Sequence, residues 1–175
     1  MTAATYDLGK LHGGLRLEAN KADSTRRGLA IMPVPAQVVL PLAQHIGNAA
    51  EPIVGIGERV LKGQLIARHP AGLGAPVHAS TSGKVVAIEP WPVARRQGDP
   101  APCIVIESDG EDRAIERPEA RTDRSELAPE HLAAMILEGG IVGLGGAVFP
   151  TAQKIEQARS SQLDMLILNG VECEP

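Results

Sequence analysis

Aromatic residues and cysteines are almost missing from this sequence. One Tyr, one Trp and one Phe occur among 175 residues, so a hydrophobic core has to be built from Val, Ile, Leu and Ala, which suit small β modules. The two cysteines, Cys103 and Cys173, are too few for a disulfide framework or a cysteine-rich metal cluster. We therefore predict aliphatic packing in a reducing, cytoplasmic compartment, with Cys103 as an ordinary buried thiol.

Long hydrophobic runs and basic clusters are missing as well. The longest apolar runs have about four to six residues, far below the ~20 that span a bilayer, and the N-terminus lacks the basic and apolar regions of a secretory signal. Net charge is −4, with 17 Lys and Arg against 21 Asp and Glu. These absences predict no direct membrane span and no nucleic-acid binding. The scattered histidines predict no metal site, and His78 is expected to be structural.

Short apolar runs separated by turns fill the first two thirds of the chain. The 19 Gly and 14 Pro agree with many short elements. The predicted strands are 36–40, 58–61, 64–68, 84–89 and 103–107. Because Val60–Ile66 and Gly83–Ile88 form a weak internal repeat, we predict a small β barrel-sandwich hybrid with biotinyl/lipoyl-like spacing.

A swinging-arm carrier is one alternative for such a module. Biotinyl and lipoyl carriers display a modifiable lysine at the tip between their two half-repeats. Here the tip is His69–Pro76, which contains no lysine. The sequence therefore predicts an unmodified module.

The organisation changes after the β module, where a charged stretch poor in large apolar side chains predicts a linker. Apolar residues spaced by three and four then predict an amphipathic helix over Ala128–Glu138, with Pro129 in its first turn and Gly139-Gly140 at its end. A Gly-rich loop, a helix over 150–160 and a buried strand over 163–168 should follow, as at the start of an α/β domain.

The fold class is therefore mixed α and β. The predicted organisation is an N-terminal arm at 1–30, a β module at 31–115, a linker at 116–127 and the start of an α/β domain at 128–175.

The Gly-rich loop is the first candidate for chemistry. Gly143, Gly145, Gly146 and Ala147 let backbone amides approach a ligand closely, and the next helix directs its first N–H groups and its positive dipole end at an anion such as a phosphate. Lys154 adds a positive charge. No Gly-Lys-Ser/Thr follows, so this is not a Walker loop, and a plain turn is the alternative.

The second candidate follows the predicted strand at 163–168. Carboxyl ends of strands in open α/β sheets carry ligand-binding residues, and this one is followed by Asn169, Glu172 and Glu174. An amide and two carboxylates can bind the edge of a heterocycle, although solvated surface carboxylates are the alternative. We predict that this segment and the Gly-rich loop face a common hollow.

Motifs in both parts of the chain resemble one family in order. They are His12–Gly14, Glu18–Lys21, Leu40–Leu42, Gln44–Gly47, Gly57–Gln64, Pro76–Ala79, Thr81–Gly83, Ala101–Ile106, Gly143–Thr151 with Lys154, and Asn169–Pro175. These segments look like the RnfC family of the Rnf ion-translocating electron transport complex, which is related to the flavin subunit of respiratory complex I.

The resemblance implies an FMN site. Gly143, Gly145, Gly146 and Ala147 would line the FMN phosphate and ribityl chain, Lys154 would contact the flavin, and Asn169 and Glu172 would approach the isoalloxazine ring. The positions of Phe149 and Glu174 would lie towards NADH. Leu144 departs from the complex I pattern, which has Arg there. Val148 departs from a usual Gly and so reduces the freedom of the backbone near the ligand.

The resemblance also implies a setting. The parent subunit would oxidise or reduce NAD(H) through FMN and pass electrons to [4Fe–4S] clusters, at the cytoplasmic face of the bacterial inner membrane and in contact with other subunits of an ion-translocating complex. Family members continue with more of the nucleotide domain and with cluster-binding cysteine runs. This chain alone, soluble by this reasoning, is therefore expected to bind FMN weakly or not at all and to bind no cluster. A non-catalytic docking module is the alternative function.

Overall fold

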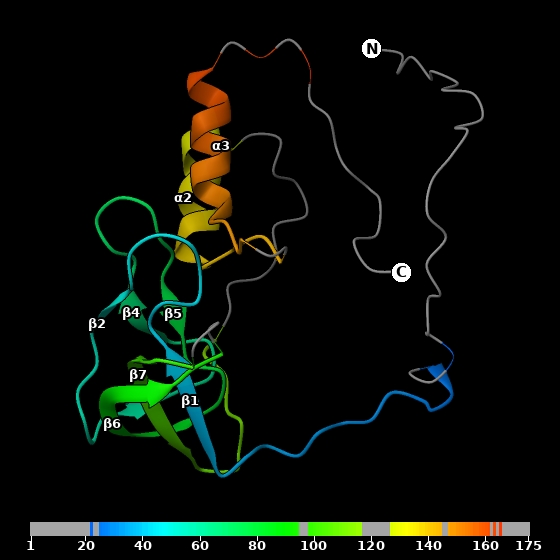
Figure 1. Ribbon diagram of the computed structural model, residues 1–175, viewed down its shortest axis with the longest axis vertical. Helices are drawn as coiled ribbons and strands as arrows, with labels where there is room; N and C mark the ends of the chain where they lie inside the picture. Colours follow the sequence, from blue (N-terminus) through cyan, green and yellow to red (C-terminus); the bar gives the residue numbers. More distant parts are fainter. Residues whose placement is uncertain are drawn as a thin grey trace. The chain divides into compact units, whose positions relative to one another are not determined.

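The computed structural model describes residues 22, 25–94, 98–116, 127–144, 147–161, 163 and 165. The chain divides into two compact units, residues 32–166 and residues 1–31 with 167–175. In the second unit, the described side chains of Leu29 and Ile31 are fully exposed. The first unit carries the strands and helices labelled in Figure 1.

Two antiparallel sheets form the β module. The described strands are β1 (Gln37–Pro41), β2 (Glu51–Pro52), β3 (Arg59–Val60), β4 (Leu65–Arg68), β5 (Val77–His78), β6 (Gly83–Pro92) and β7 (Pro100–Ser108). One sheet has the order β1-β7-β6-β3 and the other has the order β2-β4-β5. The predicted strands are confirmed, although β6 and β7 extend beyond the predicted ends.

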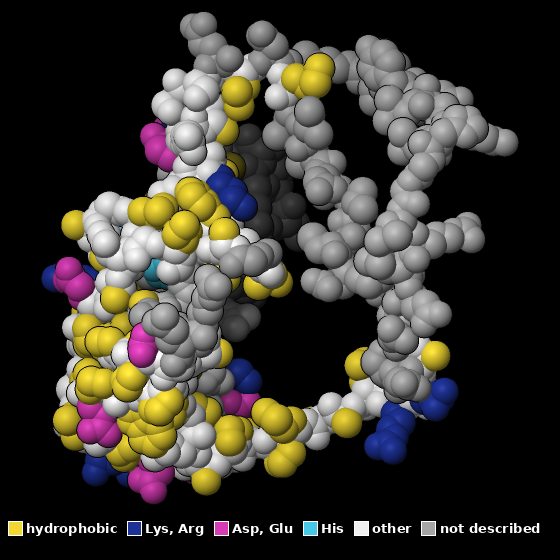
Figure 2. Space-filling view, in the orientation of Figure 1, with side chains coloured by type: hydrophobic (Ala, Val, Ile, Leu, Met, Phe, Trp, Pro, Cys, Tyr) yellow, Lys and Arg dark blue, Asp and Glu magenta, His cyan; other side chains and the backbone are white. Residues whose placement is uncertain are grey.

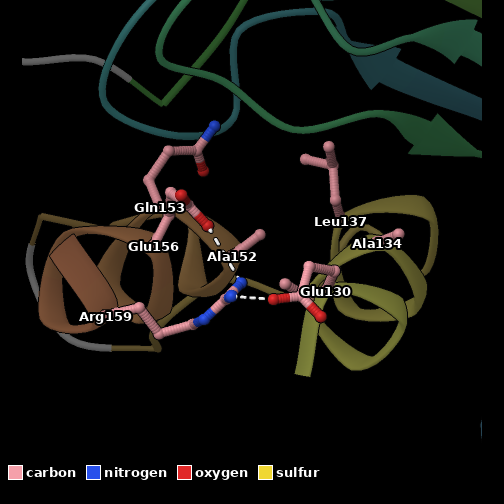
Figure 3. Close-up of a pocket in the computed structure, with 8 residues that line it drawn as sticks. Glu130, Ala134, Leu137, Ala152, Gln153, Glu156 and Arg159 are labelled. Atoms are coloured by element: carbon pink, nitrogen blue, oxygen red, sulfur yellow. Dashed lines mark hydrogen bonds and ion pairs between the residues drawn. The ribbon is translucent and has the colours of Figure 1, made fainter. Parts of the chain in front are cut away.

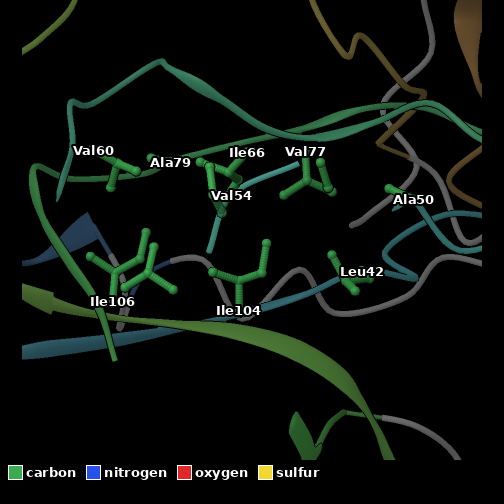
Figure 4. Packing of buried hydrophobic residues seen from close by; sticks show 11 residues of the cluster. Leu42, Ala50, Val54, Val60, Ile66, Val77, Ala79, Ile104 and Ile106 are labelled. Carbon is green, nitrogen blue, oxygen red and sulfur yellow. The ribbon is translucent and has the colours of Figure 1, made fainter. Parts of the chain in front are cut away.

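The hydrophobic core lies between the two sheets (Figure 4). Ile66 projects from one sheet, and Ile104 and Ile106 project from the other, all three with no exposed surface. Burying such a side chain contributes about 1.5–3 kcal/mol each, so aliphatic packing can replace the missing aromatics, as predicted. Cys103 is also buried, and its thiol donates a hydrogen bond to the Ala101 carbonyl at 3.1 Å.

The long β6–β7 pair curls because of a local irregularity. The register shifts between Val85 and Ala87, which is the signature of a β-bulge and bends the strand. At the start of β6 the chains approach so closely that a Cβ at Gly83 would lie 2.0 Å from the Glu107 carbonyl oxygen. Only glycine fits there, so the predicted turn residue Gly83 also sets the spacing of the two strands.

A polar network closes the end of the module after β7. The hydroxyl of Ser82, which is fully buried, donates to Asp109 at 2.6 Å and accepts from the Arg113 amide at 2.9 Å. Hydrogen bonds from Ser82 and then from Arg113 lower the pKa of Asp109 to about 2. Nearby, Lys62 bonds Asp112 at 2.5 Å. The network pins the segment that follows β7 to the β module.

Two helices follow, α2 (Pro129–Glu138) and α3 (Thr151–Ser160). They lie side by side and antiparallel, and an ion pair between Glu130 and Arg159 joins the start of one to the end of the other (Figure 1). Both predicted helices are confirmed, and each begins one residue later than predicted.

The predicted end of α2 is also confirmed. The amide of Gly140, at a φ of +64°, bonds the Leu137 carbonyl, and the amide of Ile141 bonds the Ile136 carbonyl. This pattern is a Schellman motif, in which glycine adopts the left-handed conformation at little cost.

The predicted buried strand at 163–168 is not present at the two positions that the structure describes. Leu163 and Met165 have no regular secondary structure and are 59% and 74% exposed. A strand needs a neighbour for its backbone N–H and C=O groups, and no strand pairs with these two residues in the described ranges. The other positions of this segment lie outside the described residues.

Candidate functional site

The Gly-rich segment forms a loop whose two ends are joined by hydrogen bonds. The amide of Gly143 donates to the Phe149 carbonyl at 2.8 Å, and the amide of Thr151 donates to the Ile141 carbonyl at 3.0 Å. A β-bridge between Val142 and Pro150 lies between these bonds. The two ends of the loop between α2 and α3 are therefore held together by backbone hydrogen bonds.

Lys154 lies at the base of this loop. Its amine is 5.7 Å from the centroid of the Phe149 ring, within the range of a cation–π interaction. A Cβ at Gly143 would lie 3.1 Å from the same amine. Glycine at this position therefore leaves the space that the positive charge occupies.

The partial positive charge at the start of α3 is not neutralised by a capping or acidic side chain in its first turn. Its N-cap is Pro150, no side chain caps the first turn, and the first turn contains no acidic residue. The first N–H groups of a helix and its dipole together carry a partial positive charge. With Lys154 in the same turn region, this end of α3 favours an anion.

Val148 adopts a backbone conformation that is costly for its residue type. Its φ is +44°, in the left-handed region, which costs about 1–2 kcal/mol for an L-residue and is exceptional for a β-branched one. The resemblance to the complex I loop gives glycine as the usual residue at this position. Val148 therefore adopts a conformation that glycine would adopt at little cost.

The predicted site residues divide into two groups. Gly143, Ala147, Phe149 and Lys154 are described and lie in the loop or the first turns of α3. The others lie outside the described residues: Gly145, Gly146, Asn169, Glu172 and Glu174. The predicted common hollow between loop and strand end therefore stays a prediction.

A cleft lies between the loop and the β module, and we call it the joint cleft. Its volume is about 360 Å³. Its lining residues come from both parts: Leu40, Gln44, His45, Ala75, Pro76, Val77, His78 and Ser80 from the β module, and Gly140, Val142, Leu144 and Val148 from the loop region. Sequence reasoning missed this cleft, because no local pattern connects the start of β5 with a loop more than sixty residues later.

His78 lies where the two parts meet. Burial lowers the pKa of His78, while a hydrogen bond to the Glu138 backbone carbonyl acts in the opposite direction. A Cβ at Gly140 would lie 3.0 Å from the Pro76 carbonyl oxygen and 3.3 Å from the Nδ1 atom of His78. His78 therefore forms part of a cleft wall, which the sequence did not predict.

Two further contacts hold the cleft walls. Gln153 Nε2 donates to the Gly74 carbonyl at 3.2 Å, which ties α3 to the loop before β5. His45 Nε2 accepts from the Ala75 amide at 2.9 Å, and its Nδ1 lies 3.1 Å from the Ile46 carbonyl oxygen. Hydrogen bonds therefore hold the segment before β5 in place, from α3 through Gln153 and from within the β module through His45.

A second hollow of about 390 Å³ lies between α2 and α3 (Figure 3). Small side chains such as Ala134 and Ala152 form its floor, and Glu130 and Glu156 stand at its rim, both paired with Arg159. Two carboxylates disfavour a phosphate there, and the single guanidinium is already engaged. This groove is therefore poorly suited to an anionic ligand.

Other classes of site find no support in the described part of the chain. No group of three His, Cys, Asp or Glu side chains there is arranged to hold a metal ion, and none of its helices has the length and apolarity needed to cross a bilayer. On the face in Figure 2, acidic and basic side chains are interspersed among hydrophobic ones.

Comparisons with known families match both parts of the chain. Residues 9–111 match the family described as the RnfC barrel sandwich hybrid domain, and residues 136–175 match the family described as the Nuo51 FMN-binding domain. The second match includes the Gly-rich loop, Lys154 and the segment Asn169–Pro175.

Individual relatives agree. The chain is 44% identical over 166 residues to the C subunit of the ion-translocating oxidoreductase complex of Rhodobacter capsulatus, which covers 94% of this chain and 32% of the relative. It is 42% identical to the same subunit of the Vibrio cholerae complex, and the match covers 93% of this chain and 21% of the relative. It is 39% identical to the C subunit of a proton-translocating ferredoxin:NAD(+) oxidoreductase complex from Clostridium ljungdahlii, covering 96% and 36%. The chain thus spans about a third of these relatives or less.

Proposed function

Because this chain belongs to the RnfC family of Rnf ion-translocating oxidoreductase complexes, we propose that its Gly-rich loop and the start of α3 bind the phosphate of FMN. The observation that carries the proposal is the coincidence of an FMN-binding family match with an uncapped helix start and a lysine amine at the base of a closed loop.

Each part of the loop has a defined task in this proposal. Gly145, Gly146 and Ala147 present backbone amides to the phosphate and ribityl chain. Gly143, whose own amide is bonded to the Phe149 carbonyl, lines the same site and leaves room for the Lys154 amine. Lys154 and the positive end of α3 supply the charge. Asn169 and Glu172 approach the isoalloxazine ring. When bound, FMN supplies the redox chemistry, since it takes up a hydride and releases electrons singly.

The proposed wider role is electron transfer between NAD(H) and iron–sulfur clusters in a membrane ion-translocating complex. Phe149 and Glu174 would lie on the NADH side of the flavin. The relative from Clostridium ljungdahlii carries ferredoxin and NAD(+) in its name, which agrees with these partners. The proposed location is the cytoplasmic face of the inner membrane, held by other subunits, with [4Fe–4S] clusters elsewhere in the full subunit.

The proposed domain organisation has the predicted limits. The unmodified, biotinyl/lipoyl-like module at 31–115 would serve as a rigid support, the arm at 1–30 and linker at 116–127 would flank it, and residues 128–175 would begin the FMN and NADH domain.

A second candidate is a non-catalytic docking module. It is favoured by apolar surface on the helical part, because α2 has no buried residue, Ile141 is half exposed, and Leu144 is 97% exposed. Such surface is typical of a protein contact. The docking role predicts no flavin binding.

Quenching of flavin fluorescence separates the two functions. A trace of FMN is titrated with a large excess of the chain, so that weak binding is detected. The proposal predicts saturable quenching that weakens about tenfold in Lys154→Gln, since a charge-assisted hydrogen bond is lost. Lys84→Gln, at an exposed lysine on β6, is the matched control and should bind like the wild type. No quenching by the wild type would favour the docking module.

A further inference from the structure

We propose that the joint cleft receives the isoalloxazine ring of the flavin and that His78, from the β module, is a binding residue for the edge of that ring. This inference rests on the proposed function and adds to it a second wall, contributed by the barrel-sandwich part of the chain. The β module would then be part of the cofactor site and not only its support.

The walls of the cleft suit a flat, largely apolar heterocycle. Leu40 and Val77 lie on the β-module side, and Val142, Leu144 and Val148 lie on the loop side. A volume of about 360 Å³ falls in the range of about 300–1,000 Å³ that small-molecule sites occupy. Apolar walls with a few polar groups are the usual composition of such sites.

His78 is the polar group best placed to recognise the ring edge. Its ring lines the cleft, and its Nδ1 atom would lie 3.3 Å from a Cβ at Gly140. Burial lowers the pKa of His78 and so favours the neutral ring, in which one nitrogen is an acceptor. The imide N–H of an isoalloxazine is a donor that matches it, whereas a phosphate has no such donor.

The loop can contact both ends of one FMN molecule. Gly143, at its base, faces the amine of Lys154, while Leu144 and Val148 line the joint cleft. An anion at Lys154 and a ring against Val148 would therefore lie on adjacent parts of the same short loop. This arrangement assigns the phosphate and the ring to different faces of the loop.

The cleft is preformed. Gly140 packs closely against Pro76 and His78, where an added Cβ would lie 3.0 Å from the Pro76 carbonyl oxygen, and Gln153 bonds Gly74. These contacts join the loop region and the β module at two points. A rigid slot binds a rigid ring with a small loss of conformational entropy.

Riboflavin is the probe that separates the ring from the phosphate. The complete chain, labelled with ¹⁵N and ¹³C, is titrated in parallel with riboflavin, FMN and inorganic phosphate, and chemical shifts are followed by NMR, which detects weak binding. Riboflavin is expected to shift His78, Ala75 and Val77. Inorganic phosphate is expected to shift Gly143 and Lys154 only, and FMN is expected to shift both groups.

Variants identify the contact. His78→Phe keeps a planar ring without the acceptor and should weaken riboflavin binding about five- to tenfold. Ser80→Tyr fills the cleft from an exposed position and should abolish the shifts even if His78→Phe folds poorly. The matched control is His69→Phe, at an exposed histidine of the same module.

The outcomes are distinguishable. If FMN shifts Gly143 and Lys154 while the cleft residues stay unchanged with both flavins, the ring lies elsewhere and this inference is overturned, although the proposed function stands. If no flavin or phosphate shifts the loop, the proposed function fails instead.

Discussion

The amine of Lys154 lies over the ring of Phe149 and directly beside the backbone of Gly143. Phe149 thus holds a positive charge at the base of the loop, and the glycine leaves room for it. Both the charge and the space beside it can be altered by single substitutions, and so can the packing that supports the loop.

Gly143→Ala should separate stability from binding. The new Cβ would lie 3.1 Å from the Lys154 amine and 3.5 Å from the Phe149 carbonyl oxygen, so the flexible lysine end has to move. We expect the free energy of unfolding to change by less than about 1 kcal/mol, while FMN affinity falls about tenfold. Urea denaturation and FMN titration measure the two quantities. Gly55→Ala, with open space around its Cβ, is the control and should change neither.

Val148→Gly should not destabilise the chain, although it removes a half-buried side chain. Relief of the left-handed strain offsets the lost contacts and the greater entropy of unfolded glycine, so the free energy of unfolding should stay equal or rise by up to about 1 kcal/mol. Val142→Gly, in the β-bridge of the same loop, should lower it by about 1–2 kcal/mol. Equal losses in both variants would show that Val148 is unstrained.

Gly83→Ala should disrupt the β module. The added Cβ would lie 2.0 Å from the Glu107 carbonyl oxygen and 2.9 Å from the Cα of Ser108, both backbone atoms of β7 that cannot move independently. Overpacking against backbone should lower the free energy of unfolding by about 3 kcal/mol or more. Thermal unfolding followed by circular dichroism measures the effect. A melting temperature close to that of Gly55→Ala would contradict the close approach of β6 and β7.

Asp109 should make stability depend on pH in the acid range. Its pKa of about 2 in the folded chain lies below the ordinary value of 3.8, so protonation favours the unfolded state. The contribution of the Asp109 carboxylate to the free energy of unfolding is complete above about pH 4 and is lost as pH falls towards 2. In Asp109→Asn the melting temperature should change less with pH over this interval.

The exposed Asp99→Asn is the control for that measurement. Its melting temperature should follow the wild-type pH profile. An Asp109→Asn profile parallel to the wild type would contradict the hydrogen-bond network with Ser82 and Arg113.

Local signals in the sequence were sufficient for the helices and their ends. Pro129 in a first turn and glycine in the left-handed position after a last turn act through nearby backbone atoms, so the bounds of α2 could be predicted. The Val148 position was identified differently, from the resemblance to the complex I loop, in which a glycine is usual there.

Contacts between distant residues could not be predicted in this way. The pairing of Gln37 with Glu107 and the meeting of His78 with Gly140 depend on how the two sheets curl and where α2 ends. Nothing near His78 in the sequence indicates a cleft. The joint cleft is therefore visible only in three dimensions, although its residues are each unremarkable in the sequence.

The most direct test of the central claim is the ³¹P NMR signal of FMN in the presence of a large excess of the chain, so that weak binding is detected. If the loop and Lys154 bind the phosphate, the ³¹P resonance should shift and broaden with the wild type and with Lys84→Gln, and return towards its free position with Lys154→Gln. A resonance that stays at its free position with the wild type, or that shifts equally with Lys154→Gln, would contradict the account.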